Sequence, residues 1–148
     1  MITQLKTCMQ SAILSTAPLF QKEGIAFLRI TVGLLMVYHG VEVFDSKLIE
    51  EYARWDSFKI FSNPLLMAYV GKSAEFISGL LLAIGFLTRP AAFLLMLTML
   101  FITFFIGHGK FWYDDQHPFM MALMALVFIC CGPGKWSVDQ LFFPQQKR

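Results

Sequence analysis

Charged residues are scarce in this sequence. Aspartate, glutamate, lysine and arginine make up 15% of the 148 residues, whereas an ordinary soluble domain contains about 25%. Hydrophobic residues make up 57%, and several apolar runs approach or exceed the ~18 residues that mark a membrane span. A single soluble core does not need runs of this length. The composition therefore favours a polytopic membrane protein over a soluble one.

The sequence also lacks the motifs that bind common redox cofactors. It contains no CxxCH haem site, no GxGxxG nucleotide loop and no cysteine cluster. We expect the three cysteines, Cys8, Cys130 and Cys131, to be buried thiols, because free cysteine behaves as a small hydrophobe. A net charge of +2 without a basic stripe argues against nucleic acid as a partner. The cofactor is therefore unknown at this stage.

Four apolar runs predict four membrane-spanning helices. They cover residues 24–44, 66–87, 90–107 and 118–132. At ~1.5 Å rise per residue, the longer runs can cross a hydrocarbon core ~30 Å thick; the fourth run is shorter and is compatible with a core or re-entrant helix as well. Only Thr88 and Arg89 separate the second and third runs, so these helices must be antiparallel neighbours. The predicted fold class is an all-α, integral-membrane, antiparallel four-helix bundle.

The segments outside these runs have different characters. Residues 1–23 are predicted to form an interfacial or flexible N-terminal segment, residues 24–143 the membrane domain and residues 144–148 a tail. Between the first two runs, apolar residues recur at a spacing that predicts an amphipathic helix along the membrane surface. These residues are Leu48, Ile49, Tyr52, Trp55, Phe58 and Ile60.

The distribution of lysine and arginine predicts the orientation, since these residues are enriched in cytoplasmic loops. One side of the predicted membrane domain holds Lys6, Lys22, Arg89, Lys135, Lys147 and Arg148, and the other holds Lys47, Arg54, Lys59 and Lys110. We therefore expect both termini to be cytoplasmic.

Ionisable and polar side chains converge on the outer half of this predicted bundle. A charge at the centre of a bilayer costs ~2.5–3.5 kcal/mol, so such groups usually face the bundle interior and find partners. We therefore expect a shared outer-leaflet pocket, although those near helix ends are also compatible with simple contact with interfacial water. The candidate ligand-binding residues are His39, Glu42, Glu75, His108, His117, Tyr38 and Tyr69.

This set of residues is compatible with three chemistries. A quinone headgroup needs hydrogen-bonding groups, a proton acceptor and an apolar lane, which histidine, carboxylate, tyrosine and the many Phe and Met residues would supply. Metal binding is disfavoured because His39 and Glu42 form one reversed pair instead of repeated Glu-x-x-His pairs. Proton-coupled transport would use the same acids, but the runs lack the Gly/Pro breaks of many transporters.

The first run also carries a buried or snorkelling arginine and a glycine stripe. Arg29 has two expected destinations: the lipid headgroups at the cytoplasmic end, or the bundle interior towards Glu75. Gly33 and Gly40 allow another helix to approach closely. Whether that helix belongs to the same chain or to a second copy in a homodimer stays open.

Several segments resemble the DoxX family of small four-helix membrane proteins. They are LRITVGLLMVYHGVEVF in the first run, GKSAEFISGLLLAIGFLTRPAAF across the second and third, and the closing CCGPGKWSVDQLF. The matching positions include the His39–Gly40 pair, Glu75, the Gly85-x-x-Thr88-Arg89 turn and the final GPGKWSVD, within residues 24 to 143.

The resemblance implies a four-helix bundle in a bacterial inner membrane. For some members it implies a subunit of a thiosulfate:quinone oxidoreductase; other relatives are linked to oxidative or thiol stress. It places His39 and Glu75 in a pocket and pairs Arg89 with Asp139 as a structural ion pair at the cytoplasmic face. Our hypothesis is a quinone-binding, redox-linked membrane protein that works with a soluble or peripheral redox subunit. The alternatives are a non-catalytic assembly partner and a small proton-coupled transporter.

Overall fold

Helices account for all the regular secondary structure in the part of the chain that the structure describes. The computed structural model describes residues 19–142, so the predicted N-terminal segment lies mostly outside it and the predicted tail entirely so. Three of its helices are long and apolar enough to cross a membrane: Gln21–Phe44, Pro64–Ile84 and Thr88–Ile106. A fourth apolar helix, Gln116–Cys131, is shorter.

These segments divide into several named elements. The first comprises α2 (Gln21–Gly40) and the 3-10 turn η1 (Val41–Phe44), and the second is α4 (Pro64–Ile84). The third joins α5 (Thr88–Phe101) to η3 (Ile102–Ile106), and the fourth is α6 (Gln116–Cys131). The short elements α3 (Ser46–Ala53), η2 (Asp56–Phe58) and α7 (Val138–Phe142) lie at the ends of the molecule.

Local capping explains why α4 begins two residues before the predicted run. At α4, the side chain of Asn63 accepts a hydrogen bond from the N–H of Leu66 at 3.0 Å, and Pro64 occupies the first turn, where a missing N–H costs nothing. The helix ends at Gly85, whose φ of 71° is the left-handed conformation that glycine adopts most readily. Hydrophobicity alone does not reveal a polar cap such as Asn63.

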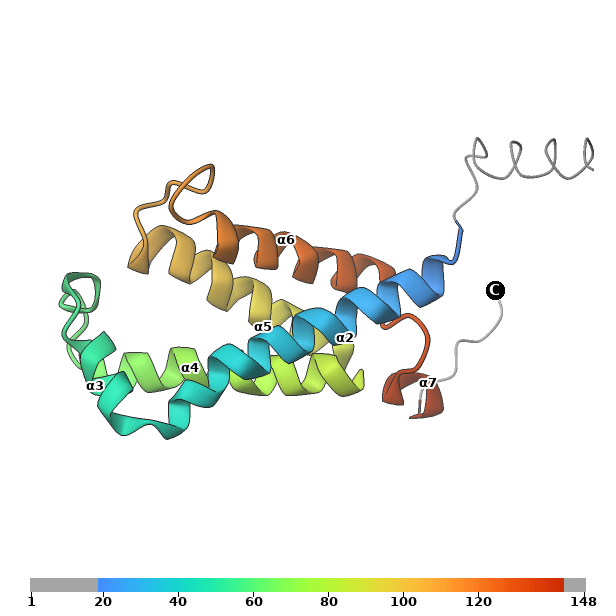
Figure 1. Ribbon diagram of the computed structural model, residues 1–148, viewed down its shortest axis with the longest axis horizontal. Coiled ribbons are helices and arrows are strands. Elements are labelled where there is room, and N and C mark those ends of the chain that lie inside the picture. The colour runs from blue at the N-terminus through green and yellow to red at the C-terminus, as the bar shows by residue number, and fades with distance from the viewer. Residues whose placement is uncertain (1–18, 143–148) are drawn as a thin grey trace, which may run out of the picture.

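Helices α2 and α4 pack against each other, as do α5 and α6, and α4 also contacts α5 (Figure 1). Glycines bring α2 and α4 unusually close: a Cβ at Gly33 would lie 2.7 Å from the Cα of Ala83, and one at Gly79 would lie 2.7 Å from the backbone nitrogen of Val37. The glycine stripe of α2 is therefore covered by α4 of the same chain. It offers no surface for a second copy.

The buried core lies between these four helices. Its apolar side chains come from α2, α4, α5 and α6, and small residues of α5 and α6 allow close packing. The fully buried members include Val32, Met36, Leu82, Ala92, Leu95, Ala125 and Phe128.

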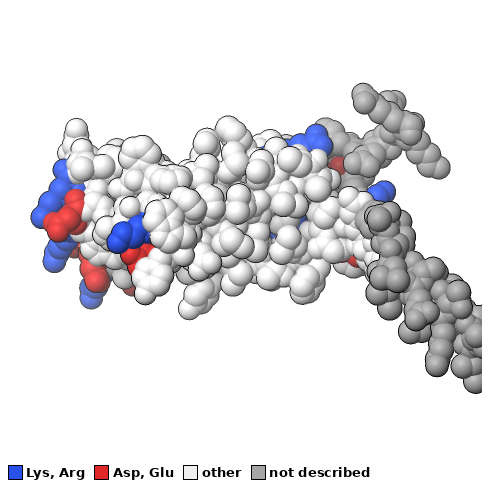
Figure 2. All heavy atoms as spheres, turned by 90° about the horizontal axis from the view of Figure 1, so that it is seen from above, with Lys and Arg blue, Asp and Glu red and all other residues white. Residues whose placement is uncertain are grey.

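Charge is concentrated at the two ends of the long axis. Figure 2 shows lysine, arginine, aspartate and glutamate gathered at both ends, whereas the band between them is nearly free of charge on the face shown. Exposed side chains within this band are large and apolar, for example Leu34, Leu80 and Leu97. An uncharged band between polar ends is the surface that a bilayer requires.

Arg29 has neither of the two predicted destinations. Its guanidinium is fully buried and donates to main-chain carbonyls at the end of α4, those of Leu82 and Ala83. It also donates to the carbonyls of Pro133, at 2.8 Å, and Trp136, at 2.9 Å. The reason is electrostatic: the last carbonyls of a helix lack intrahelical partners and carry partial negative charge. Arg29 thus ties the end of α4 to the segment after α6.

The expectation of buried cysteines is wrong for the two that the structure describes. Cys130 and Cys131 are both exposed near the end of α6. In a membrane protein the outer surface is apolar, so a small hydrophobic side chain can face outwards without a penalty. Cys8 lies outside the described residues.

Candidate functional site

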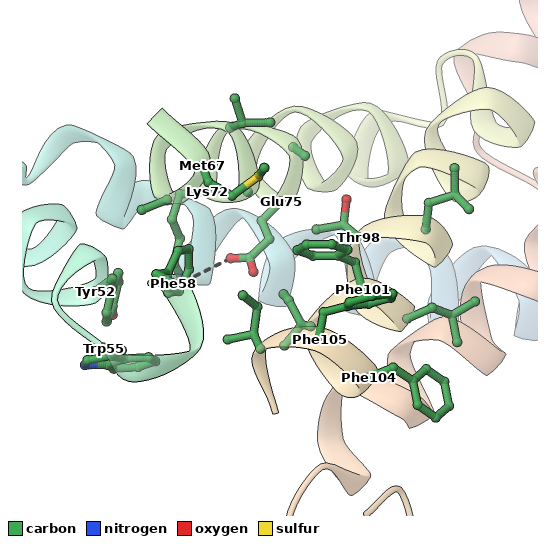
Figure 3. Close-up of a pocket in the computed structure, with 18 of the residues that line it drawn as sticks. Tyr52, Trp55, Phe58, Met67, Lys72, Glu75, Thr98, Phe101, Phe104 and Phe105 are labelled. Atoms are coloured by element: carbon green, nitrogen blue, oxygen red, sulfur yellow. Dashed lines mark hydrogen bonds and ion pairs between the residues drawn. The ribbon is translucent and has the colours of Figure 1, made fainter. Parts of the chain in front are cut away.

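A pocket of about 670 Å³ lies between α4 and the α5–η3 segment, beneath α3 and η2 (Figure 3). Most of its lining side chains are apolar, and several that form its rim, including Val70, Leu97 and Phe104, are exposed on the band without charge. The polar side chains in the lining are Tyr52, Trp55, Lys72, Glu75 and Thr98. The pocket is therefore an apolar space that meets the lipid-facing surface and contains few polar groups.

The wall opposite α4 is built by a π-helix. Helix α5 widens into η3 at Ile102, and the N–H of Gly107 donates to the carbonyl of Ile102 at 2.7 Å, five residues earlier. Such π-turns are rare and occur frequently at functional sites. Phe105, within this turn, lies almost parallel to Phe101, with ring centroids 5.0 Å apart, and both rings line the pocket. The π-helix thus shapes an aromatic wall.

One end of the pocket carries a compact ion cluster. The ammonium of Lys72 lies 2.7 Å from Oε2 of Glu42 and 3.1 Å from Oε2 of Glu75. The hydroxyl of Tyr52 donates to the same Glu42 oxygen at 2.9 Å, and the Lys72 ammonium also lies 5.2 Å from the centre of the Tyr52 ring. The cluster joins η1, α3 and α4 through one cation.

Helical spacing explains the contact between Lys72 and Glu75. Lys72 and Glu75 are three residues apart on α4, so their side chains meet on one face of the helix. Glu42 and Tyr52 arrive from separate elements, because η1 and α3 fold back over the start of α4. At Tyr52, burial and the hydrogen bond to Glu42 both disfavour the phenolate and raise its pKa to about 12. Tyr52 therefore remains a hydrogen-bond donor at neutral pH.

Of the predicted ligand-binding residues, Glu75 lines the pocket and Glu42 reaches it through Lys72. Glu75 is 5% exposed, which makes it the most enclosed carboxylate of the site. Tyr69 does not line the pocket; it packs beside it, against the small apolar cluster that contains Ile49 and Phe58.

His39, His117 and Tyr38 lie close to one another but outside the pocket, and His108 lies outside the pocket as well. The rings of His39 on α2 and His117 on α6 lie with their centroids 5.7 Å apart. Tyr38 contacts the edge of His39 but is itself 76% exposed. The side chain of His108 is exposed, while its backbone N–H donates to Asp115. A histidine pair therefore flanks α2 on the side of α6.

The two residues predicted to form a cytoplasmic ion pair do not pair with each other. Both carboxylate oxygens of Asp139 accept backbone hydrogen bonds, from Leu87 at 2.7 Å and Thr88 at 2.8 Å. They thereby satisfy N–H groups at the start of α5, which have no intrahelical partner. Arg89 is exposed, with no ion pair at 4 Å or less in the described region.

Sequence reasoning did not assign Lys72, Tyr52 or Thr98 to the site. Lys72 carries the same signal as Glu75, an ionisable residue inside an apolar run, and the three-residue spacing indicates that the two side chains meet. Tyr52 and Thr98 have no such signal, because their place in the pocket depends on how α3 and α5 approach α4. Within residues 19–142, no three His, Cys, Asp or Glu side chains lie close enough to share a metal ion.

The fold and the pocket together define a small α-helical membrane protein with a side pocket that carries one ion cluster. The sequence matches the DoxX family over residues 24–108, more than half of the chain, and the protein belongs to that family. It is also similar to a protein of Haemophilus influenzae described as uncharacterized, with 29% identity over 127 residues that cover 80% of this chain and 90% of the relative. No solved structure matches the sequence.

Proposed function

We propose that this DoxX protein binds a quinone or a similar small redox molecule in the pocket between α4 and α5. In this proposal the protein is an antiparallel four-helix bundle of a bacterial inner membrane, with both termini in the cytoplasm. The cluster of Lys72 and Glu75 then lies in the outer leaflet. The observation that carries the proposal is the pocket itself: a space of about 670 Å³ whose lining is apolar except for a few polar groups.

The chemistry of the lining matches such a ligand. Binding sites for small molecules are typically apolar concavities of ~300–1,000 Å³ with a few well-placed polar groups. Here the aromatic wall of Phe101 and Phe105 supports a flat ring, and the exposed rim residues Val70 and Leu97 give an apolar tail access to lipid. Glu75 supplies a hydrogen-bonding group and a proton acceptor.

The proposal includes a redox partner. The sequence carries no motif for haem, flavin or iron–sulfur binding, so electrons would have to be exchanged with a soluble or peripheral subunit. The pocket would serve as the place where that subunit meets the membrane pool of quinone.

A pocket-filling substitution tests the proposal. A Cβ added at Gly71 or at Gly24 would meet no neighbouring atom within 4 Å, and of these two glycines Gly71 alone lines the pocket. In lipid nanodiscs, the wild-type protein should bind a decyl-substituted ubiquinone, measured by calorimetry. Gly71→Phe should weaken binding by about tenfold or more, because the ring occupies the ligand's volume, whereas the matched Gly24→Phe should leave it unchanged.

Two results would contradict quinone binding. One is the absence of measurable binding by the wild-type protein; the other is equal binding by Gly71→Phe and Gly24→Phe. Substrate-dependent uptake into proteoliposomes that is lost in Glu75→Gln would instead support the transporter alternative.

A further inference from the structure

The polar hydrogens around the pocket are already committed within the protein. The hydroxyl of Thr98 donates to the carbonyl of Leu94 at 2.9 Å, and the hydroxyl of Tyr52 donates to Glu42 at 2.9 Å. Each hydroxyl has a single hydrogen to donate. Neither side chain can therefore donate to a ligand without breaking an existing hydrogen bond.

The lining also contains two side chains with nitrogen donors, Lys72 and Trp55. The Lys72 ammonium is held between Glu42 and Glu75 and over the ring of Tyr52. Figure 3 shows the nitrogen of Trp55 on the side of its ring that faces away from Glu75. Two of the three hydrogens of the ammonium are matched by these acids, so a ligand head that needs a hydrogen bond from the protein has only the third, on a cation that already lies over the Tyr52 ring.

An acceptor, by contrast, is free. Lys72 bonds to Oε2 of Glu75, and Oε1 of Glu75 has no hydrogen-bond partner within the described residues. The carboxylate is enclosed but lines the pocket, and Figure 3 shows it extending from α4 towards the α5–η3 wall. An enclosed carboxylate oxygen gains most from a hydroxyl donor, since hydrogen bonds to charged acceptors are short and strong.

We propose that the pocket selects ligands whose head donates a hydrogen bond, so that a phenol or quinol is preferred over the corresponding ether or quinone. This inference rests on the proposed function and adds the chemical class of the head. A phenolic O–H placed against the Phe101–Phe105 wall would donate to Oε1 of Glu75. A quinone carbonyl at the same place would point its lone pairs at those of the carboxylate and would have to compete with two acids and the Tyr52 ring for the Lys72 ammonium.

A pair of probes that differ only in the donor tests this selection without redox chemistry. In nanodiscs, para-nonylphenol should bind the wild-type protein about tenfold more tightly than para-nonylanisole, in which a methyl group replaces the hydroxyl hydrogen. Decylubiquinol, kept reduced under anaerobic conditions, should show the same preference over decylubiquinone. Calorimetry measures both pairs.

Glu75→Gln should reduce the phenol–anisole preference to about threefold or less, because the amide offers a donor as well as an acceptor. Glu51→Gln, an acid on the exposed face of α3, is the matched control and should keep the wild-type preference. The comparison of probes on the wild-type protein stands even if Glu75→Gln does not fold. Binding of both members of a pair with equal affinity would overturn the selection but leave the proposed pocket function intact; binding of neither would overturn both.

Discussion

The guanidinium of Arg29 is fully buried and donates to carbonyls from two separate parts of the chain, the end of α4 and residues 133–136. Arg29→Met keeps an unbranched side chain but removes every donor. Carbonyls that are buried without a partner each cost about 1–3 kcal/mol. We expect the free energy of unfolding to fall by about 3 kcal/mol, measured by titrating detergent-solubilised protein with SDS and following tryptophan fluorescence.

Arg89 is the matched control for this substitution. It is an exposed arginine at the same end of the molecule, and Arg89→Met should change stability by about 0.5 kcal/mol or less. Equal losses in the two variants would mean that Arg29 contributes only its charge to this end of the molecule, and the hydrogen-bond argument would be wrong.

Single residues show where sequence reasoning reaches its limit. Glu75 and Lys72 can be found from the sequence, because an ionisable side chain inside an apolar run must find a partner. The partners of Arg29 cannot be recognised in this way, because they are main-chain carbonyls and every residue has one. Asp139 is a similar case, since the backbone N–H groups of Leu87 and Thr88 take its carboxylate in place of the predicted arginine.

Among contacts between helices, the one between α2 and α4 depends on glycine. A Cβ at Gly40 would lie 2.7 Å from the Cβ of Phe76, so even alanine forces the helices apart. We expect Gly40→Ala to lower the free energy of unfolding by about 2 kcal/mol, the usual cost of overpacking. SDS titration measures the change.

Gly24 provides a control of opposite sign. It lies in the same helix, and a Cβ added there would have no neighbour within 4 Å, so Gly24→Ala should stabilise the protein by up to about 1 kcal/mol through helix propensity alone. If both substitutions were neutral or stabilising, α2 and α4 would not pack as closely as described.

Elements were predictable wherever hydrophobicity defines them. The apolar runs place every long helix to within a few residues, and at α4 the polar cap Asn63 accounts for the earlier start. The π-helix η3 was not predicted, because residues 101–106 are apolar except for Thr103 and contain no glycine or proline. This segment contacts α6 and η2, and the sequence pattern does not reveal such tertiary contacts.

The distribution of charge over the whole molecule gives the pocket its two characters, an apolar lining and one ionic end. Charged groups on the face shown in Figure 2 are gathered at the two ends, whereas the buried Arg29 and the ion cluster of Glu42, Lys72 and Glu75 lie further inwards. Its two acids and one base neutralise one another only in part, so the cluster is anionic when all three groups are charged. An amphipathic ligand that enters from the lipid would meet a hydrogen-bond acceptor at the end of an apolar path.

The proposed orientation can be tested by cysteine labelling. Lysine and arginine are enriched on the cytoplasmic side of membrane proteins, and their distribution along the sequence predicts that both termini lie there. In a background with Cys8, Cys130 and Cys131 replaced by serine, a membrane-impermeant maleimide should label Ser62→Cys in intact cells and Gln21→Cys only after permeabilisation. Both positions are exposed at opposite ends of the described structure. The reverse pattern would place the pocket in the cytoplasmic leaflet, and labelling of both positions in intact cells would contradict a crossing of the membrane by α2.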